Sequence, residues 1–142
     1  MEERERRGDL TALVLIFLTV WVALLTFLLS RNPLRVRIIS PEDRAEVGYR
    51  VLVDGTLNDP SARLYLIVKP KRGSSWWVQE PIRSYKRWRG VAYLGGEDWG
   101  IGEEFTLFVL ASHRPLNLLP GEIDELPKAE AVSNKVRVRR VR

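Results

Sequence analysis

The run from Leu10 to Leu29 constrains this chain more than any other part of its sequence. Its twenty residues, LTALVLIFLTVWVALLTFLL, include no charged side chain. A helix rises about 1.5 Å per residue, so a helix of this length spans about 30 Å, the thickness of the hydrocarbon core of a bilayer. The sequence therefore predicts a transmembrane helix over residues 10–30, with a short charged tail before it (1–9) and a linker after it (31–33).

Two other interpretations of this run fit the sequence less well. A buried core helix is usually shorter and has a polar face, whereas only Thr11, Thr19 and Thr26 interrupt the apolar surface. A cleavable signal peptide has a shorter apolar region that ends in small residues, whereas this run continues into SRNP at residues 30–33. We therefore expect an uncleaved signal anchor in a single-pass cell-membrane protein. Trp21, in mid-span, faces either lipid or a partner helix in a helix–helix association.

The charges that flank the run leave its orientation open. Arg4, Arg6 and Arg7 precede it, and four arginines beginning at Arg31 follow it closely, so the positive-inside rule does not decide. A charged tail before a first apolar segment resembles a signal-anchor start, and we expect the C-terminal domain to be extracytoplasmic. The alternative is a cytoplasmic domain. The composition of the region after the run favours this alternative. That region contains 20 of the 23 Lys and Arg but only 14 of the 18 Asp and Glu, so it is basic.

Residues 34–142 suffice for one domain, and their pattern is that of short strands. The sequence has no Cys, which excludes disulfides and thiolate nucleophiles. Alternating or wholly apolar segments, separated by turn residues, predict about seven strands and no long helix. They predict a mainly β fold, an antiparallel β-sandwich, with a small barrel as the alternative. The segments lie at residues 34–41, 47–57, 63–70, 75–80, 87–95, 104–112 and 134–142.

Two later segments are less regular. Residues 113–131 contain three prolines and allow at most a single helical turn at their acidic centre. In the last segment Val136 and Val138 face one way and the arginines between and after them the other. Arg140 and Val141 then break the alternation, which predicts fraying or a bulge in a charged edge strand.

A resemblance supports the sandwich. The run IISPEDRAEV, followed by VLVDGTL, resembles the opening two strands of prokaryotic immunoglobulin-like surface modules. The later WWVQ, YLG, G-x-x-F and SNKVRV elements are similar to membrane-anchored modules of that kind, and the resemblance covers most of residues 34–142. It implies an immunoglobulin-like β-sandwich that acts as a spacer or binding module, and it implies no chemistry, because every motif is a strand or a turn. The Cys pair of antibody-type domains is lacking.

Few residues have the pattern of a catalytic or metal site. His113 is the only histidine, and no nucleophile and base accompany it. The glycines at 95, 96, 100 and 102 match neither a P-loop nor a dinucleotide fingerprint, and the carboxylates around them match no calcium loop. An enzymatic role would need an acid pair such as Glu80 with Glu103. We therefore expect no enzymatic activity, no cofactor and no metal.

One basic aromatic stretch is the candidate binding surface. Between Lys69 and Arg89, cationic side chains are interleaved with Trp and Tyr, and such groups bind sugars, anionic polymers or lipid headgroups by stacking and charge. One tryptophan of the pair Trp76 and Trp77 is expected in the core. The residues predicted to form the surface are Trp77, Arg83, Tyr85, Lys86, Arg87, Trp88 and Arg89.

Together these patterns favour a non-enzymatic, single-pass membrane protein whose β-sandwich lies next to the bilayer and binds a protein partner or an envelope polymer. An extracytoplasmic position disfavours nucleic acid as a partner. The alternative is a cytoplasmic-facing sensor or accessory subunit that binds an anionic ligand through the basic aromatic surface.

Overall fold

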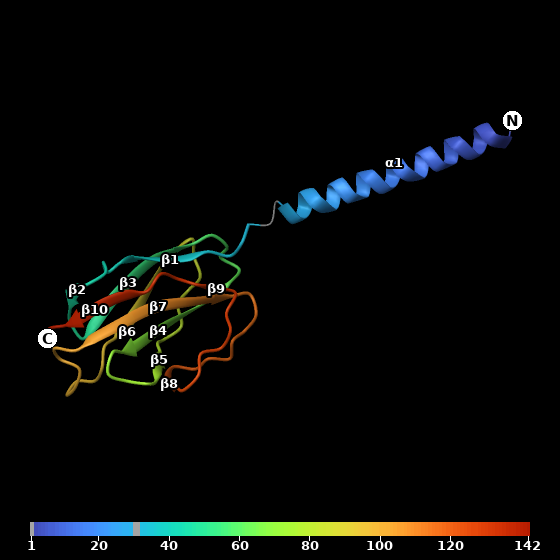
Figure 1. Cartoon of the computed structure of the whole chain (residues 1–142). Helices are drawn as coiled ribbons and strands as arrows, with labels where there is room; N and C mark the ends of the chain where they lie inside the picture. Colours follow the sequence, from blue (N-terminus) through green and yellow to red (C-terminus); the bar gives the residue numbers. More distant parts are fainter. Residues whose placement is uncertain (1, 30–31) are drawn as a thin grey trace. The chain divides into compact units, whose positions relative to one another are not determined.

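The computed structural model describes residues 2–29 and 32–142, and it divides into two units, of which the first ends at Pro33 and the second is Leu34–Arg142. The first unit contains one helix, α1 (Glu2–Leu29), shown in blue in Figure 1. Its segment Arg6–Leu28 is long and apolar enough to cross a membrane. The predicted apolar helix is thus confirmed, but it begins at Glu2, so the charged tail belongs to it. Ser30 and Arg31, the expected helix end and linker start, lie outside the described residues.

The three threonines of α1 are compatible with a lipid environment. The hydroxyl of Thr11 donates a hydrogen bond to the carbonyl of Arg7 at 2.7 Å. Thr19 and Thr26 bond in the same way to the carbonyls four residues before them, each at 2.8 Å. Because a polar group in hydrocarbon must be satisfied within the protein, these bonds remove the cost of placing the hydroxyls in a membrane.

The second unit is built of strands, as predicted for a mainly β domain. Several of its strands alternate buried and exposed residues, and the strands appear in Figure 1 from cyan to red. Residues 34–142 form no helix; the 113–131 segment has short strands where a helical turn was allowed. The strands are β1 (Val36–Ser40), β2 (Ala45–Val47), β3 (Arg50–Leu57), β4 (Arg63–Pro70), β5 (Trp76–Val78), β6 (Arg87–Tyr93), β7 (Glu104–Ser112), β8 (Gly121–Ile123), β9 (Ala131–Val132) and β10 (Val136–Arg140).

The strands form two sheets that face each other across one core. The smaller sheet has the order β1-β3-β6, and the larger has β2-β10-β7-β4-β5-β8 with β9 beside β7. Every pair is antiparallel except β2 with β10, which is parallel. No strand of the smaller sheet pairs with a strand of the larger one within residues 34–142, so the sheets are layers and not a closed barrel.

The main core lies between the sheets, because each strand turns every second residue inward. Val53 and Trp88 from the smaller sheet meet Leu66, Phe105 and Val138 from the larger one. A second apolar cluster lies on the outer face of the larger sheet, where β4 and β7 supply Ile67, Phe108 and Leu110. These two strands are therefore buried on both faces, which agrees with their nearly continuous apolar sequences.

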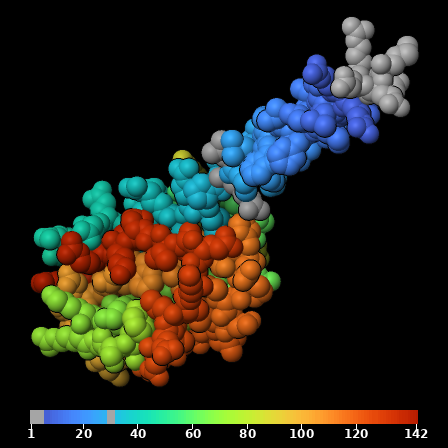
Figure 2. Space-filling view, turned by 45° about the vertical axis from the view of Figure 1, so that its right-hand side comes forward, coloured from blue at the N-terminus to red at the C-terminus, as the bar shows by residue number. Residues whose placement is uncertain are grey.

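The 113–131 segment covers that outer cluster. Leu116, Leu118, Ile123 and Leu126 pack on it, and the orange segment covers one side of the domain in Figure 2. Its prolines prevent a regular helix, while its apolar side chains find a surface to cover.

The end of the chain differs from the prediction. β10 is no charged edge strand, because β7 pairs along one side of it and β2 along the other. It does not fray at Arg140 either, since Val138 and Arg140 are both on the inner face and Arg140 is only 3% exposed. The alternation continues through Arg140, which places a guanidinium inside the domain.

Candidate functional site

An aromatic groove lies between the end of β6, in the smaller sheet, and β5, in the larger one. We define it by four rings: Tyr49, which precedes β3, Trp77 of β5, Tyr93 at the end of β6, and Trp99 of the loop between β6 and β7. They line a cavity of about 270 Å³ together with Pro70 and other side chains. Ligand pockets are mostly apolar hollows with a few polar groups, and this cavity is of that kind, although its volume lies just below the usual range.

The rings form two tilted pairs. The ring centroids of Tyr49 and Tyr93 are 5.3 Å apart, and those of Trp77 and Trp99 are 6.5 Å apart. Tilted pairs at such distances are favourable for aromatic side chains. Tyr93 and Trp99 nevertheless remain 41% and 47% exposed. A large apolar area is therefore held in a defined position while it is still open to a ligand.

Arg140 holds the loop that supplies Trp99. Its Nη1 donates hydrogen bonds to the carbonyl oxygens of Leu94, Gly96 and Trp99 at 2.8, 2.6 and 2.8 Å. Its guanidinium carbon lies 4.6 Å from the centre of the Tyr49 ring, a cation–π contact. Its Nε also donates to the main-chain oxygen of Arg142 at 3.0 Å. These groups compensate a buried charge that has no Asp or Glu side chain as an ion-pair partner within residues 34–142.

The loop itself is shaped by glycine. Gly95 has φ +83°, a conformation that favours glycine, and an added Cβ would meet the carbonyl oxygen of Trp99 at 2.5 Å. The amide of Gly96 donates to the same carbonyl at 3.1 Å. The tight turn thus brings three carbonyls together where a single guanidinium can reach them.

Gln79 connects the two walls of the groove. Its side-chain oxygen accepts a hydrogen bond from the backbone N–H of Tyr93 at 2.8 Å, and its amide nitrogen donates to the carbonyl of Trp77 at 3.2 Å. One side chain therefore links the end of β6 to β5, and the groove does not depend on loop packing alone.

The structure does not bring the seven predicted surface residues together. Trp77 lines the groove, packed in part against the main core, while Trp76 packs against the outer cluster. The prediction that Trp88 lies on the surface is wrong. This residue is 2% exposed and lies in the core, because β6 turns its even-numbered residues inward. The other predicted residues are exposed but outside the groove lining; they are Arg83, Tyr85, Lys86, Arg87 and Arg89.

Sequence reasoning missed Tyr49, Tyr93, Trp99 and Arg140 as parts of one site. The rings are separated by up to fifty residues, and no local pattern joins them. For Arg140 a signal was present, because the period-two pattern that places Val136 and Val138 inward places residue 140 inward as well.

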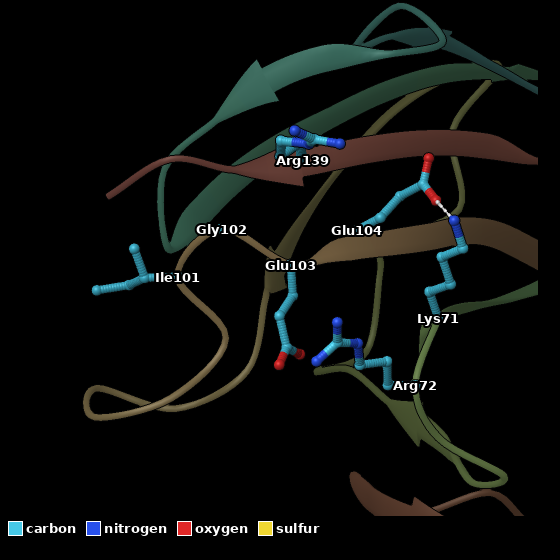
Figure 3. Close-up of a pocket in the computed structure, with 7 residues that line it drawn as sticks. All are labelled: Lys71, Arg72, Ile101, Gly102, Glu103, Glu104 and Arg139. Carbon is cyan, nitrogen blue, oxygen red and sulfur yellow. Dashed lines mark ion pairs between the residues drawn. The ribbon is translucent and has the colours of Figure 1, made fainter.

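A second, charged cavity of about 600 Å³ lies beside the start of β7 (Figure 3). Lys71 and Glu104 form an ion pair there at 3.2 Å, and the side chains of Arg72 and Glu103 point toward one another. With Arg139, three basic and two acidic side chains line the cavity, so its positive and negative charges nearly cancel. Glu103 lines this cavity and Glu80 lines the aromatic groove, so the acid pair considered for an enzyme is not assembled in one cavity.

His113, just after the end of β7, connects the turn after β3 with the segment before β9. It therefore lies at the other end of β7 from the charged cavity. Its Nε2 lies 2.8 Å from Oδ2 of Asp59, and its Nδ1 lies 3.0 Å from Oε2 of Glu130. The hydrogen bond with Asp59, and then that with Glu130, raises the pKa of His113. Bonds from Ser61 and His113 lower the pKa of Asp59 to about 2, and the bond with His113 lowers the pKa of Glu130.

Substitution His113→Gln is expected to lower the stability of the domain in a pH-dependent way. A raised folded pKa means that the contribution of His113 is complete below its unfolded pKa of about 6.5 and is lost as the pH rises through the folded value. The lowered pKa values of the carboxylates mean that their contribution is lost below about pH 4. Denaturant midpoints of the two proteins should therefore differ most between about pH 5 and 6 and converge as the pH rises above the folded pKa of His113. A difference that is constant with pH would contradict this.

Among residues 2–29 and 32–142, no group of three His, Asp or Glu side chains is arranged to hold a metal ion.

No protein-family model matches the chain, and neither a curated protein nor a solved structure is significantly similar to it.

Proposed function

We propose that this protein is a non-enzymatic binding module, anchored by α1 in the cell membrane, that receives a protein partner or an envelope polymer in its aromatic groove. The observation that carries the proposal is the set of four rings around one cavity, with the loop of Trp99 held in place by the buried Arg140. Tyr and Trp are the residues that most often dominate binding energies, because they offer a large apolar area with few rotatable bonds. A groove that is rigid before binding loses little entropy when it is occupied.

The proposal includes an immunoglobulin-like sandwich. The order β1-β3-β6 in one sheet and β10-β7-β4-β5 in the other is that of strands A-B-E and G-F-C-C′ in such domains. It also includes a signal anchor with the domain extracytoplasmic. The satisfied threonines and the exposed apolar side chains of α1 support a span. The predicted prokaryotic origin belongs to the same proposal.

Substitution Trp99→Ala tests the groove. The substitution removes an exposed ring but keeps the backbone carbonyl that bonds to Arg140, so the loop should retain its conformation. After crosslinking in intact cells, recovery of bound protein or envelope polymer with the tagged full chain is expected to fall by about tenfold. The matched control is Tyr85→Ala, which removes another exposed ring, one that lies outside the groove. Equal recovery with both variants would refute a role for the groove.

A second candidate function follows from charge. The outer face of the smaller sheet carries Arg37, Arg50, Arg87 and Arg89 against a single carboxylate, Asp54. This favours the cytoplasmic-facing sensor that binds an anionic ligand. Protease treatment of intact cells separates the two functions: digestion of the domain from outside excludes the sensor, and full protection excludes envelope binding.

A further inference from the structure

The strand β6 has a free edge. It pairs with β3 only, so it forms one border of the smaller sheet. Its even-numbered residues bond to β3: Leu57 N–H donates to the carbonyl of Lys86, and Leu94 N–H donates to that of Tyr49, at 2.8 and 2.9 Å. In an antiparallel pair, the odd-numbered residues that alternate with these point their N–H and C=O groups away from the partner strand. The backbone groups of Arg87, Arg89 and Val91 therefore face outward from the sheet.

Those outward groups are unpaired. At the end of the strand, the N–H of Tyr93 is bonded by the Gln79 side chain, which confirms the direction of the odd-numbered residues. For Arg87, Arg89 and Val91, no residue in the described parts of the chain supplies a backbone partner. Because each unpaired group favours a hydrogen bond, a row of them is a template for one more strand.

The charge around this edge selects the strand that fits. Arg87 is in register with Thr56 and, across it, with Arg37; Arg89 is in register with Asp54 and pairs with it at 2.6 Å. The surrounding excess of arginine repels a second copy of the same edge, since like charges on adjacent strands are unfavourable. It attracts an acidic segment. The backbone geometry therefore fits an extended polypeptide, and the arginine side chains favour a polypeptide that carries negative charge.

We infer that an extended, acidic segment of a partner protein adds to the free edge of β6 as a fourth strand of the smaller sheet. Main-chain hydrogen bonds to Arg87, Arg89 and Val91 would supply the pairing, and the arginines would select for Glu and Asp on the outer face of the added strand. This surface is separate from the aromatic groove, so each can be tested without the other.

Two synthetic peptides test the inference with the full chain in non-ionic detergent micelles. One alternates Val with Glu, and the other alternates Val with Lys. We expect the acidic peptide to bind about tenfold more tightly than the basic one. It should also slow hydrogen exchange at the amides of Arg89 and Val91, which a peptide held by charge alone would leave unchanged. N-methylation of the acidic peptide at alternate residues should abolish the protection.

A pair of variants isolates the backbone contribution. Arg89→Pro removes the outward N–H without removing a bond to β3, and proline is tolerated where the N–H of an edge strand faces solvent. Arg89→Ala removes the same side chain but keeps the N–H. We expect the proline variant to bind the acidic peptide at least about tenfold more weakly than the alanine variant, and Trp99→Ala to bind it normally.

Equal binding of the acidic and basic peptides, or binding without protection at Arg89 and Val91, would overturn the inference. So would protection of these amides that increases with protein concentration in the absence of peptide, because a second copy would then occupy the edge. If the proline variant does not fold, the N-methylated peptide still decides the matter.

Discussion

Replacing Gly55 with alanine is expected to lower the free energy of unfolding of the domain by about 3 kcal/mol or more, a large fraction of the total for a domain of this size. Gly55 lies opposite Trp88 in the register of β3 and β6. An added Cβ would overlap both the indole ring of Trp88 and the backbone carbonyl oxygen of Arg37. Neither can withdraw cheaply, because the ring is part of the core and the carbonyl belongs to the neighbouring strand β1. Denaturant unfolding followed by tryptophan fluorescence measures the loss.

Gly73→Ala is the matched control for this substitution. Gly73 lies in the turn after β4, and an added Cβ would meet Pro70 only at 3.6 Å or more, an ordinary contact. Its midpoint should stay within about 0.5 kcal/mol of wild type. A Gly55→Ala protein with the stability of this control would show that the Trp88 ring is not packed against β3 as described.

Replacing Arg140 with methionine is expected to cost about 2–4 kcal/mol and to loosen the groove. Methionine keeps much of the buried volume, but it takes the guanidinium donor away from three carbonyls. The carbonyl of Trp99 keeps the amide of Gly96 as a donor, whereas those of Leu94 and Gly96 lose the donor that Arg140 supplies. These groups can regain hydrogen bonds only from water, which requires the loop between β6 and β7 to open. Amide exchange in residues 94–100 should therefore accelerate more than in β4 or β7.

Arg139→Met controls for the loss of one positive charge at the same place in the chain. The Arg139 side chain is exposed on the other face of β10, so its loss should change stability by no more than about 0.5 kcal/mol. Recovery of the groove's ligand should fall with Arg140→Met as it does with Trp99→Ala, although residue 140 is not exposed to a ligand. Unchanged exchange in the loop after Arg140→Met would refute the role assigned to this arginine.

Much of the fold could be predicted because its signals are local. An uncharged run of twenty residues and seven segments of alternating or apolar residues depend only on neighbours in the chain, and each appears as a helix or a strand. The short strands β2, β8 and β9 were missed because two or three residues carry too little periodicity to be recognised. Each forms where another strand presents an edge to it: β10 for β2, β5 for β8 and β7 for β9.

The candidate site could not be predicted to the same extent. Interleaved basic and aromatic residues suggested one surface between Lys69 and Arg89, but the chain there crosses from β5 in one sheet to β6 in the other. The charged neighbours of Trp88 in the sequence favour a position on that surface. Period-two alternation, together with the space left by Gly55, places it in the core instead.

The amino-acid sequence is sufficient to define an apolar helix long enough for a bilayer and a β-rich domain after it, because both are set by hydrophobicity and period along the chain. The groove formed by Tyr49, Trp77, Tyr93 and Trp99, and the free edge of β6, depend on how the two sheets pair and stack. The same holds for Arg140, whose charge is acceptable in the interior because a glycine turn more than forty residues earlier presents three carbonyls to it and the Tyr49 ring lies against it. Contacts of this range exist only in the folded domain, where burial leaves the guanidinium no solvent to bind instead.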